Sequence, residues 1–186
     1  DIAIERRGVH LEATKADGRQ LVSIRKIDAL IPIPGADRII TAQIGGWPTV
    51  VKNGEFVPGE LGLYFEPDSF LDDTDPRFAF LADNAIEWEG IRGIRLKAIK
   101  LRKQLSQGLL LPLSLFPEVA TLSEDGKTYY VTLPNDNDEG QDVVTHIPRF
   151  ADPASDEYEF VSKLNFTTFL GVIKWEKIER GTEGAN

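Results

Sequence analysis

A run of positive charge is the most distinctive chemical feature of this 186-residue chain. The segment Ile91–Lys103 contains six cations and no acid, although the formal net charge of the chain is −9. These cations are Arg92, Arg95, Lys97, Lys100, Arg102 and Lys103. Attraction of the whole protein to a polyanion would need the opposite overall charge, so the run indicates a local cationic surface. Phosphate groups are the simplest ligands for it. Plain solvation of a half-exposed sheet is the alternative.

A second pattern, Lys15-Ala-Asp-Gly18, matches the motif whose lysine becomes adenylylated in nucleotidyltransferases. A nucleophilic lysine would need an adenine pocket beside it, together with later acids and lysines for metal and phosphates. The segments Trp88–Ile91 and Leu96–Lys100 only superficially supply those later motifs. Because Asp-Gly is common in hairpin turns, we favour a turn over a catalytic lysine at this position.

Other catalytic or metal-binding patterns are not supported by their spacing. The acids at Asp72-Asp73, Asp75 and Asp136–Glu139 do not form a calcium-binding loop with a distal glutamate. The two histidines, His10 and His146, lie far apart in sequence, and there is no cysteine. No serine lies in a nucleophile-elbow pattern. We therefore expect no catalytic residue, no metal site and no cofactor in this chain.

Bulk composition is that of a folded protein rather than a membrane protein. Hydrophobic residues make up 41% of the chain, and no stretch approaches the roughly 20 apolar residues that span a bilayer. The N-terminal segment has no signal-peptide core. We expect a cytoplasmic protein without a membrane partner. The absence of methionine, even at position 1, indicates a piece of a longer protein.

Short strands separated by turn residues must present the cationic run. We expect strands at Arg19–Leu30, Ile39–Ile44, Trp47–Lys52, Leu61–Glu66, Arg92–Arg102 and Gly108–Leu111. Such strands within about ninety residues predict a mainly β fold with a small closed barrel. Strict alternation separates Arg95 and Lys97 from Lys100 and Arg102. A bulge or sharp coil near Ala98-Ile99 is therefore expected to return these four cations to one face.

The remaining segments suggest additions to the barrel. We expect an acid-rich loop between Asp68 and Trp88, anchored by Phe78, Phe80 and Leu81, and a short helix at Leu113–Phe116. A hairpin at Val119–Leu133, a helix start at Asp142–His146 and a linker at Arg149–Tyr158 follow. The aromatic stretch Phe160–Lys177 is expected to dock back on the barrel.

Several long, ordered motifs carry a resemblance to a known family. They are Ile27–Ile39, Gly46-Trp47, Val50–Lys52, Gly54–Phe56, Pro58-Gly59, Tyr64–Glu66, Gly93–Arg102 and Ser106–Leu110. Together they resemble the N-terminal OB domain of one ATP-dependent RNA ligase family, with a weaker similarity at Leu170–Glu176. Pro34–Ile39 and Ser106–Leu110 also look, more loosely, like the tRNA-binding OB modules of some tRNA synthetases.

The resemblance implies an RNA-facing, five-stranded OB barrel. In that family the OB domain helps to hold the RNA strand that carries the 3′-hydroxyl. A following nucleotidyltransferase domain performs adenylylation and sealing with ATP and Mg²⁺. Because the family's catalytic lysine lies after the linker, that role is not transferred to Lys15.

The resemblance and the cationic run together indicate a binding surface. The expected phosphate-binding residues are Lys52, Arg92, Arg95, Lys97, Lys100, Arg102, Lys103, Ser106 and Gln107. Trp47, Tyr64 and Phe65 are candidate base-stacking residues, with a core role as the alternative for each.

We therefore predict an RNA-binding OB domain of an ATP-dependent RNA ligase, which positions the strand end for a partner domain outside this chain. The expected organisation is an N-terminal extension (1–18), the barrel (19–116), a hairpin and acidic-loop extension (117–148) and a linker segment (149–186). The last two form a short mixed α/β extension. A tRNA-binding or protein-interaction OB module is the alternative, and a small self-sufficient enzyme would need Lys15 in a pocket lined by acids.

Overall fold

A computed structural model describes residues 18–134 and 144–176 of the chain. The Lys15 motif except Gly18, the residue His10 and the acids Asp136–Glu139 lie outside the described residues.

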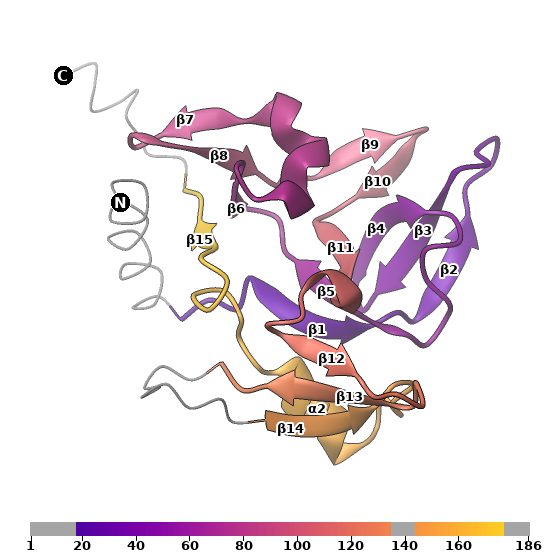
Figure 1. The fold of residues 1–186 in the computed structure, drawn as a ribbon. Helices are drawn as coiled ribbons and strands as arrows, with labels where there is room; N and C mark the ends of the chain where they lie inside the picture. The colour runs from indigo at the N-terminus through magenta and orange to yellow at the C-terminus, as the bar shows by residue number, and fades with distance from the viewer. Residues whose placement is uncertain (1–17, 135–143, 177–186) are drawn as a thin grey trace.

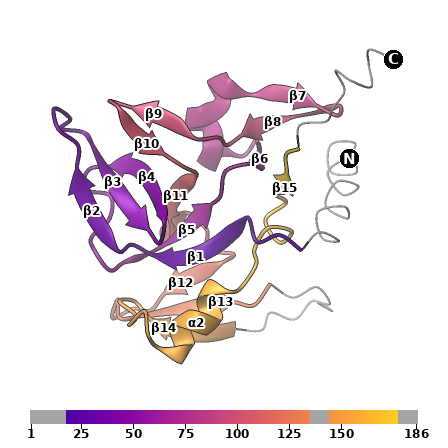
Figure 2. The same cartoon turned by 180° about the vertical axis from the view of Figure 1, so that it is seen from behind.

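Two small antiparallel sheets form the centre of the fold, and Figures 1 and 2 show them from opposite sides. One has the strand order β1-β5-β11 and the other the order β2-β3-β4. Their strands are β1 (Val22–Lys26), β2 (Ala29–Pro32), β3 (Ile39–Ile44), β4 (Trp47–Lys52), β5 (Leu61–Phe65) and β11 (Leu109–Pro112). The predicted strands at 39–44 and 47–52 are confirmed with their predicted limits.

The single strand expected at Arg19–Leu30 is instead two strands. At the break, the Ile27 N–H donates to the Glu60 carbonyl and the Asp28 N–H donates to the Gln43 carbonyl, each at 2.9 Å. The chain thus changes its partner from β5 to β3 at this corner. The change of partner bends the strand from one sheet into the other, as barrel corners require.

The junction between β4 and β11 has few backbone hydrogen bonds. The Gln107 N–H donates to the Pro48 carbonyl at 2.8 Å, and the Val50 N–H donates to the Ser106 hydroxyl at 2.9 Å. Pro48 has no N–H, so it cannot donate a ladder bond itself. The strands of the described residues accordingly form five separate sheets, and the predicted closed barrel is not present as one continuous ladder.

An insertion between β5 and β11 builds the region around the cationic run. It contains the 3₁₀ helix η1 and five strands. These elements are β6 (Ser69–Asp72), η1 (Pro76–Asn84), β7 (Ile86–Trp88), β8 (Ile91–Arg95), β9 (Ile99–Leu101) and β10 (Gln104–Ser106). Where an acid-rich loop was expected, β6, η1 and β7 are therefore ordered elements, and β6 and β7 pair with β8.

The three expected anchors of this insertion differ in burial. Phe78 is buried and packs edge-on against Phe65, with ring centroids 5.6 Å apart. Leu81 is partly buried against the same core. The expectation for Phe80 is wrong, because its side chain is 63% exposed.

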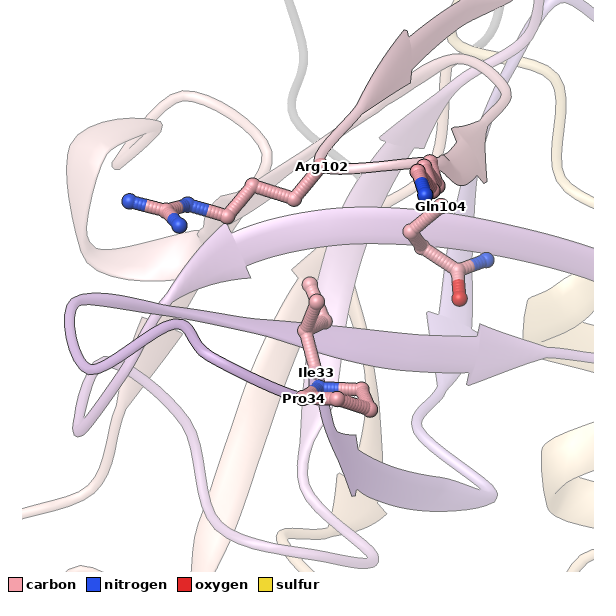
Figure 3. A pocket seen from close by; sticks show the side chains of 5 residues that line it. Ile33, Pro34, Arg102 and Gln104 are labelled. Carbon is pink, nitrogen blue, oxygen red and sulfur yellow. The ribbon is translucent and has the colours of Figure 1, made fainter.

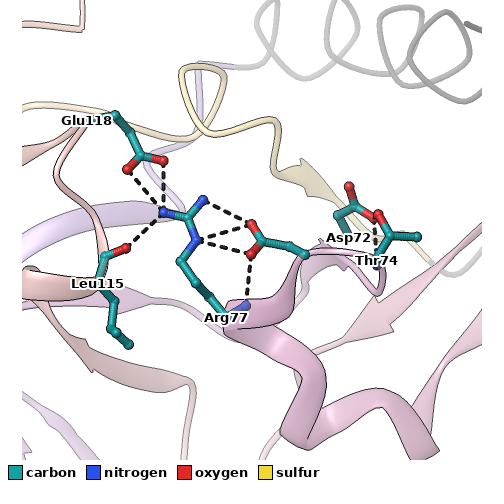
Figure 4. Close-up of polar contacts among 6 residues, drawn as sticks. Asp72, Thr74, Arg77, Leu115 and Glu118 are labelled. Atoms are coloured by element: carbon teal, nitrogen blue, oxygen red, sulfur yellow. Dashed lines mark hydrogen bonds and ion pairs between the residues drawn. The ribbon is translucent and has the colours of Figure 1, made fainter.

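Arg77 connects the insertion to the residues that follow β11 (Figure 4). Its guanidinium donates to the Asp75 carboxylate on one side and to the Glu118 carboxylate and the Leu115 carbonyl on the other. It also lies 4.2 Å from the centroid of the Phe116 ring. Asp75 is the N-cap of η1 and accepts the Arg77 N–H at 2.9 Å, so one carboxylate both starts the helix and orients the arginine.

A third sheet with one helix follows the central strands. After the short 3₁₀ helix η2 (Leu113–Leu115), the strands β12 (Ala120–Leu122), β13 (Thr128–Thr132) and β14 (Val144–Pro148) pair in that order. The predicted hairpin is thus confirmed. The predicted helix start at Asp142–His146 is wrong, because Val144–Pro148 pairs along its length with β13. The predicted linker ends in helix α2 (Asp156–Ser162), which Ser155 caps.

The C-terminal segment docks on β1 of the predicted barrel, as its aromatic content predicted. The Phe166 N–H donates to the Val22 carbonyl at 3.0 Å, and the Thr167 hydroxyl accepts the Leu21 N–H at 2.9 Å. The last strand, β15 (Ile173–Lys174), pairs with β6. Ile24, Val131 and Phe166 belong to one buried cluster, so barrel, third sheet and C-terminal segment share a core. No helix in the described part of the chain is long and apolar enough to cross a membrane.

Candidate nucleic-acid interface

The cationic run forms the end of one strand and a protruding hairpin. Strand β8 ends at Arg95, an irregular stretch follows, and β9 begins at Ile99. The interruption predicted near Ala98-Ile99 is therefore present. Strands β9 and β10 pair antiparallel with Leu101 opposite Gln104, which leaves Arg102 and Lys103 as a two-residue turn.

Four of the six cations form no ion pair with any residue that the structure describes. Lys97, Lys100, Arg102 and Lys103 are all exposed. Within residues 18–134 and 144–176, none of them forms an ion pair. In a chain of net charge −9, four uncompensated cations close together in sequence leave a local positive field that an anion can occupy.

Arg92 and Arg95 differ from those four because each is paired with an aspartate. Arg92 Nε lies 3.0 Å from an Asp73 carboxylate oxygen, and Arg95 lies 3.0 Å from an Asp68 carboxylate oxygen. The Arg95 guanidinium also lies 3.9 Å from the centroid of the Trp175 ring. These contacts hold Arg95 in place and partly neutralise it.

The hairpin tip has an uncommon backbone. Arg102 and Lys103 have φ angles of 49° and 69°, in the left-handed region that favours glycine and asparagine. The other left-handed two-residue turn of the insertion, Glu89-Gly90, places a glycine at its second position. The tip therefore keeps two cationic side chains at a conformational cost of about 1 kcal/mol each.

Two hollows lie beside this hairpin. One, of about 530 Å³, lies between the tip and the β2–β3 loop, and Figure 3 shows Ile33 and Pro34 facing Arg102 and Gln104 across it. The other, of about 460 Å³, contains Arg95 and Lys97 in its lining, and we call it the Lys97 groove. The cations thus do not all border a single depression: Arg95 and Lys97 border the groove, and Arg102 and Lys103 border the tip hollow.

Apolar side chains form most of the Lys97 groove. They come from β4, from the insertion, from the start of β11 and from the residue that follows β15. Among them are Val50, Leu81, Ile94, Leu96, Leu109 and Trp175. Phe80, Ile86, Ile99 and Leu101 also line it and remain 63%, 41%, 45% and 37% exposed. The groove is therefore an apolar depression with cations at its border.

Comparison with known proteins assigns this chain to a family. A family model described as an OB-fold domain matches residues 21–113, half of the chain. The chain belongs to this OB-fold domain family.

Solved structures similar to this OB domain come from an RNA ligase of Naegleria gruberi. A variant of that ligase with AMP and Mn is 35% identical, with a TM-score of 0.60, over 85% of this chain and 36% of that chain. The ligase with PPi is 34% identical, with a TM-score of 0.60, over 86% and 36%. This chain thus spans about a third of the length of those proteins. Curated protein sequences give no match. The expected resemblance to the OB domain of an RNA ligase is confirmed.

Ser106 and Gln107 contribute mainly to the structure of the OB domain. The Ser106 side chain is 5% exposed, and its hydroxyl accepts the Val50 N–H. The Gln107 carbonyl accepts the Tyr64 hydroxyl at 2.6 Å. Burial raises the pKa of Tyr64, so this hydroxyl stays protonated and able to donate. These bonds fix the base of the hairpin. Lys52, by contrast, is exposed at the end of β4.

Two of the three candidate stacking residues are core residues. Tyr64 and Phe65 have no exposed surface, so neither ring can stack on a base while the fold is intact. Their strand β5 is central between β1 and β11, and all five of its residues are buried, so both of its faces are covered. Trp47 is partly buried against the second core cluster. Trp175, which sequence reasoning did not single out, lines the Lys97 groove instead.

No metal centre is evident in the described part of the OB domain. Residues 18–134 and 144–176 contain no group of three or more His, Asp or Glu side chains that could hold a metal ion. The aspartates Asp68, Asp73 and Asp75 are instead paired with arginines.

Proposed function

We propose that this chain is the RNA-binding OB domain of an ATP-dependent RNA ligase. In this proposal it positions the RNA strand end that carries the 3′-hydroxyl. A nucleotidyltransferase domain of the same polypeptide, outside this chain, uses ATP and Mg²⁺ to seal the strand. The similarity to the Naegleria RNA ligase supports the assignment, and some solved structures of that ligase contain AMP or ATP with Mn.

The four unpaired cations are the single observation that carries the RNA-binding proposal. Their side chains are exposed on a hairpin and its approach, whereas the rest of the chain is acidic. Contacts from lysine and arginine to backbone phosphates orient a polynucleotide without reading its sequence. Each such contact releases counterions, so affinity for a single strand should fall with salt by a slope of about 0.7 per phosphate.

The remaining site residues receive narrower roles in this proposal. Lys52 contacts phosphate from the end of β4, and Arg92 and Arg95 contribute as partly neutralised cations. Ser106 and Gln107 position the hairpin through its base. Trp47 is the one stacking candidate whose ring is not fully buried.

The proposal also covers the limits of the domain. We place the OB barrel at residues 19–116. In this proposal its five strands close into a barrel where β4 and β11 come together. The extension at 117–148 packs on its core, and the segment 149–186 leads toward the partner domain. The segment at 1–18 precedes the barrel.

Matched pairs of charge reversals test the RNA-binding proposal. The double variant Lys97→Glu and Lys100→Glu changes the net charge by the same amount as Lys127→Glu and Lys163→Glu. The side chains of Lys127 and Lys163 are exposed just before β13 and just after α2, and Lys163 lies 3.8 Å from Glu159. We expect the first pair to weaken binding of a single-stranded RNA at least 10-fold and the second pair to change it less than 2-fold. Fluorescence anisotropy at several salt concentrations measures both.

The outcomes also separate the alternative functions. Equal affinities for the two pairs would overturn the proposal. Binding of folded tRNA with no binding of single strands would favour a tRNA-binding module. No RNA binding by the unaltered chain would favour a protein-interaction module.

A further inference from the structure

The Lys97 groove combines features that an ordinary cationic surface does not need. Four large apolar side chains on its lining, Phe80, Ile86, Ile99 and Leu101, remain at least one-third exposed. Single exposed apolar residues are normal on protein surfaces, but a cluster around a depression marks a binding site. Phosphates gain nothing from apolar walls, so the groove suits a different part of a ligand.

Cations and free polar groups border these apolar walls. Lys97 has no acidic partner in the described residues, and Arg95 presents a guanidinium already stacked on Trp175. Asn84 also lines the groove, and its exposed side-chain amide makes no hydrogen bond within the described residues. An amide offers both a donor and an acceptor. A ligand with an apolar planar part, hydrogen-bonding edges and a negative charge matches this set of groups.

Rigid elements shape the groove. Gly108 borders it with φ +80°, and a Cβ there would lie 2.5 Å from both the Phe65 carbonyl oxygen and the Tyr64 hydroxyl. Ser106 closes another part of the wall through its bond to Val50. A volume of about 460 Å³ is within the range of small-molecule sites.

We infer that the Lys97 groove holds one unpaired nucleobase of the bound RNA, with Lys97 on a neighbouring phosphate. This inference rests on the proposed function and adds a base-binding site to its phosphate contacts. Unstacked bases of single-stranded RNA lie against aromatic rings and arginine planes, as Trp175 and Arg95 provide. The apolar walls remove the base from water, and Asn84 contacts its edge.

Charge favours a nucleotide over a protein segment in the groove. A second copy of this chain has the same net charge of −9, so the two copies repel each other at long range. A neutral apolar side chain would leave Lys97 without an anionic partner. A nucleotide satisfies both the apolar walls and the cation.

A scan with abasic nucleotides tests the inference. Each position of a 12-nucleotide RNA is replaced in turn by an abasic ribose, which keeps the phosphate charge and removes the base. We expect removal of the base at one position to weaken binding about 10-fold, and removal elsewhere to matter much less.

A groove variant then links that position to the groove. In the double variant Ile99→Ser and Leu101→Ser, we expect the intact RNA to bind about 10-fold more weakly and the abasic RNA to lose no further affinity. The matched control Leu122→Ser and Phe160→Ser changes apolar residues that are 41% and 51% exposed on other elements, and it should keep the full base dependence. Circular dichroism checks folding. If the hairpin variant unfolds, Phe80→Ser replaces it.

The two proposals fail in different ways. If every abasic strand binds like the intact strand while the Lys97 and Lys100 reversal still abolishes binding, the base site is wrong and the phosphate surface stands. If the base dependence persists in the groove variant, the base lies elsewhere and the inference is overturned. If the charge reversal has no effect, the RNA-binding proposal itself fails.

Discussion

At the residue scale, neighbouring cations of one segment have different environments. Arg95 has an aspartate partner and a tryptophan beneath its guanidinium, whereas Lys97, two residues later, has neither. Charge in the sequence therefore does not by itself separate a structural cation from a free one. The contacts assign Arg95 a positioning role, since it ties β8 to the end of the C-terminal segment.

Because Arg95 and Lys97 have different contacts, removing each side chain should change the stability of the fold by a different amount. Arg95→Ala should lower the free energy of unfolding by about 1 kcal/mol, because it removes the stacking on Trp175 and the hydrogen bonds to Asp68. Lys97→Ala should change it by less than about 0.5 kcal/mol, because its side chain is exposed and unpaired. Urea unfolding followed by tryptophan fluorescence measures both. A similar loss for both variants would contradict the positioning role.

Asp75 gives a prediction about pH. Burial raises the pKa of its carboxyl, but hydrogen bonds from Arg77 and the charge of Arg77 outweigh burial, so the pKa lies below its ordinary value of 3.8. The ionised form is thus favoured in the folded state. Its contribution to stability is fully present above about pH 4 and is lost as the pH falls through the lowered pKa.

The variant Asp75→Asn should therefore be less stable than the unaltered chain at pH 6. The difference should shrink between about pH 4 and pH 2, because both chains then lack the charged carboxylate. Thermal unfolding at a series of pH values follows this convergence. A difference in Tm that stays constant to pH 2 would mean that the Arg77 contacts do not depend on this charge.

At the element scale, the β9–β10 hairpin has two cations, which we propose bind RNA, at turn positions that favour other residue types. Asn-Gly is the residue pair that suits a two-residue turn with positive φ at both positions. Arg102-Lys103 occupies this turn instead, with φ of 49° and 69°. Sequence reasoning placed one long strand over this region because two cations give no turn signal. The unfavourable turn residues fit a segment kept for function rather than for stability.

Replacing the tip by Asn-Gly tests this trade-off. The double variant Arg102→Asn and Lys103→Gly should raise Tm by about 4–8 °C, because it relieves two left-handed residues at about 1 kcal/mol each. It should also weaken RNA binding and reduce the salt slope by about 1.4, since two cations are removed. Calorimetry and anisotropy titrations give the two values.

Glu89→Asn provides the matched control, because it turns the neighbouring Glu89-Gly90 turn into Asn-Gly without removing a cation. It should not lower RNA affinity. A tip variant that is more stable and binds RNA as tightly as before would show that the tip cations do not contact RNA.

At the scale of the whole molecule, the C-terminal segment completes the candidate site. Trp175 reaches the Lys97 groove only because β15 pairs with β6 and the Trp175 N–H donates to the Asp68 carbonyl at 2.7 Å. The segment proposed to lead toward a partner domain therefore also forms part of the proposed RNA-binding surface. In that proposal, the position of the partner domain would influence the groove through this connection.

The proposed division of labour predicts that this chain does not react with ATP by itself. Incubation with labelled ATP and Mg²⁺ should leave no covalent label, because the proposed sealing chemistry belongs to the partner domain. Mass spectrometry of the protein detects an adenylate directly. A label on the unaltered chain that disappears in Lys15→Ala would overturn the division.

The sequence by itself determined the cationic run and part of the strand pattern. Alternation of apolar residues and turn signals identified β3, β4 and the β12–β13 hairpin, because these depend on neighbours close in sequence. Ordered motifs also indicated the OB family. Sequence reasoning failed at Val144–Pro148, where pairing with β13 decides the conformation.

Only the tertiary structure decided which residues meet. It buried Tyr64 and Phe65, paired Arg92 and Arg95 with aspartates, and brought Trp175 beside Arg95. Those outcomes depend on contacts between segments far apart in the chain, which local periodicity does not encode. Burial and pairing of each side chain follow from the packing of the sheets, and they separate the exposed cations that remain free to bind from those that hold the fold together.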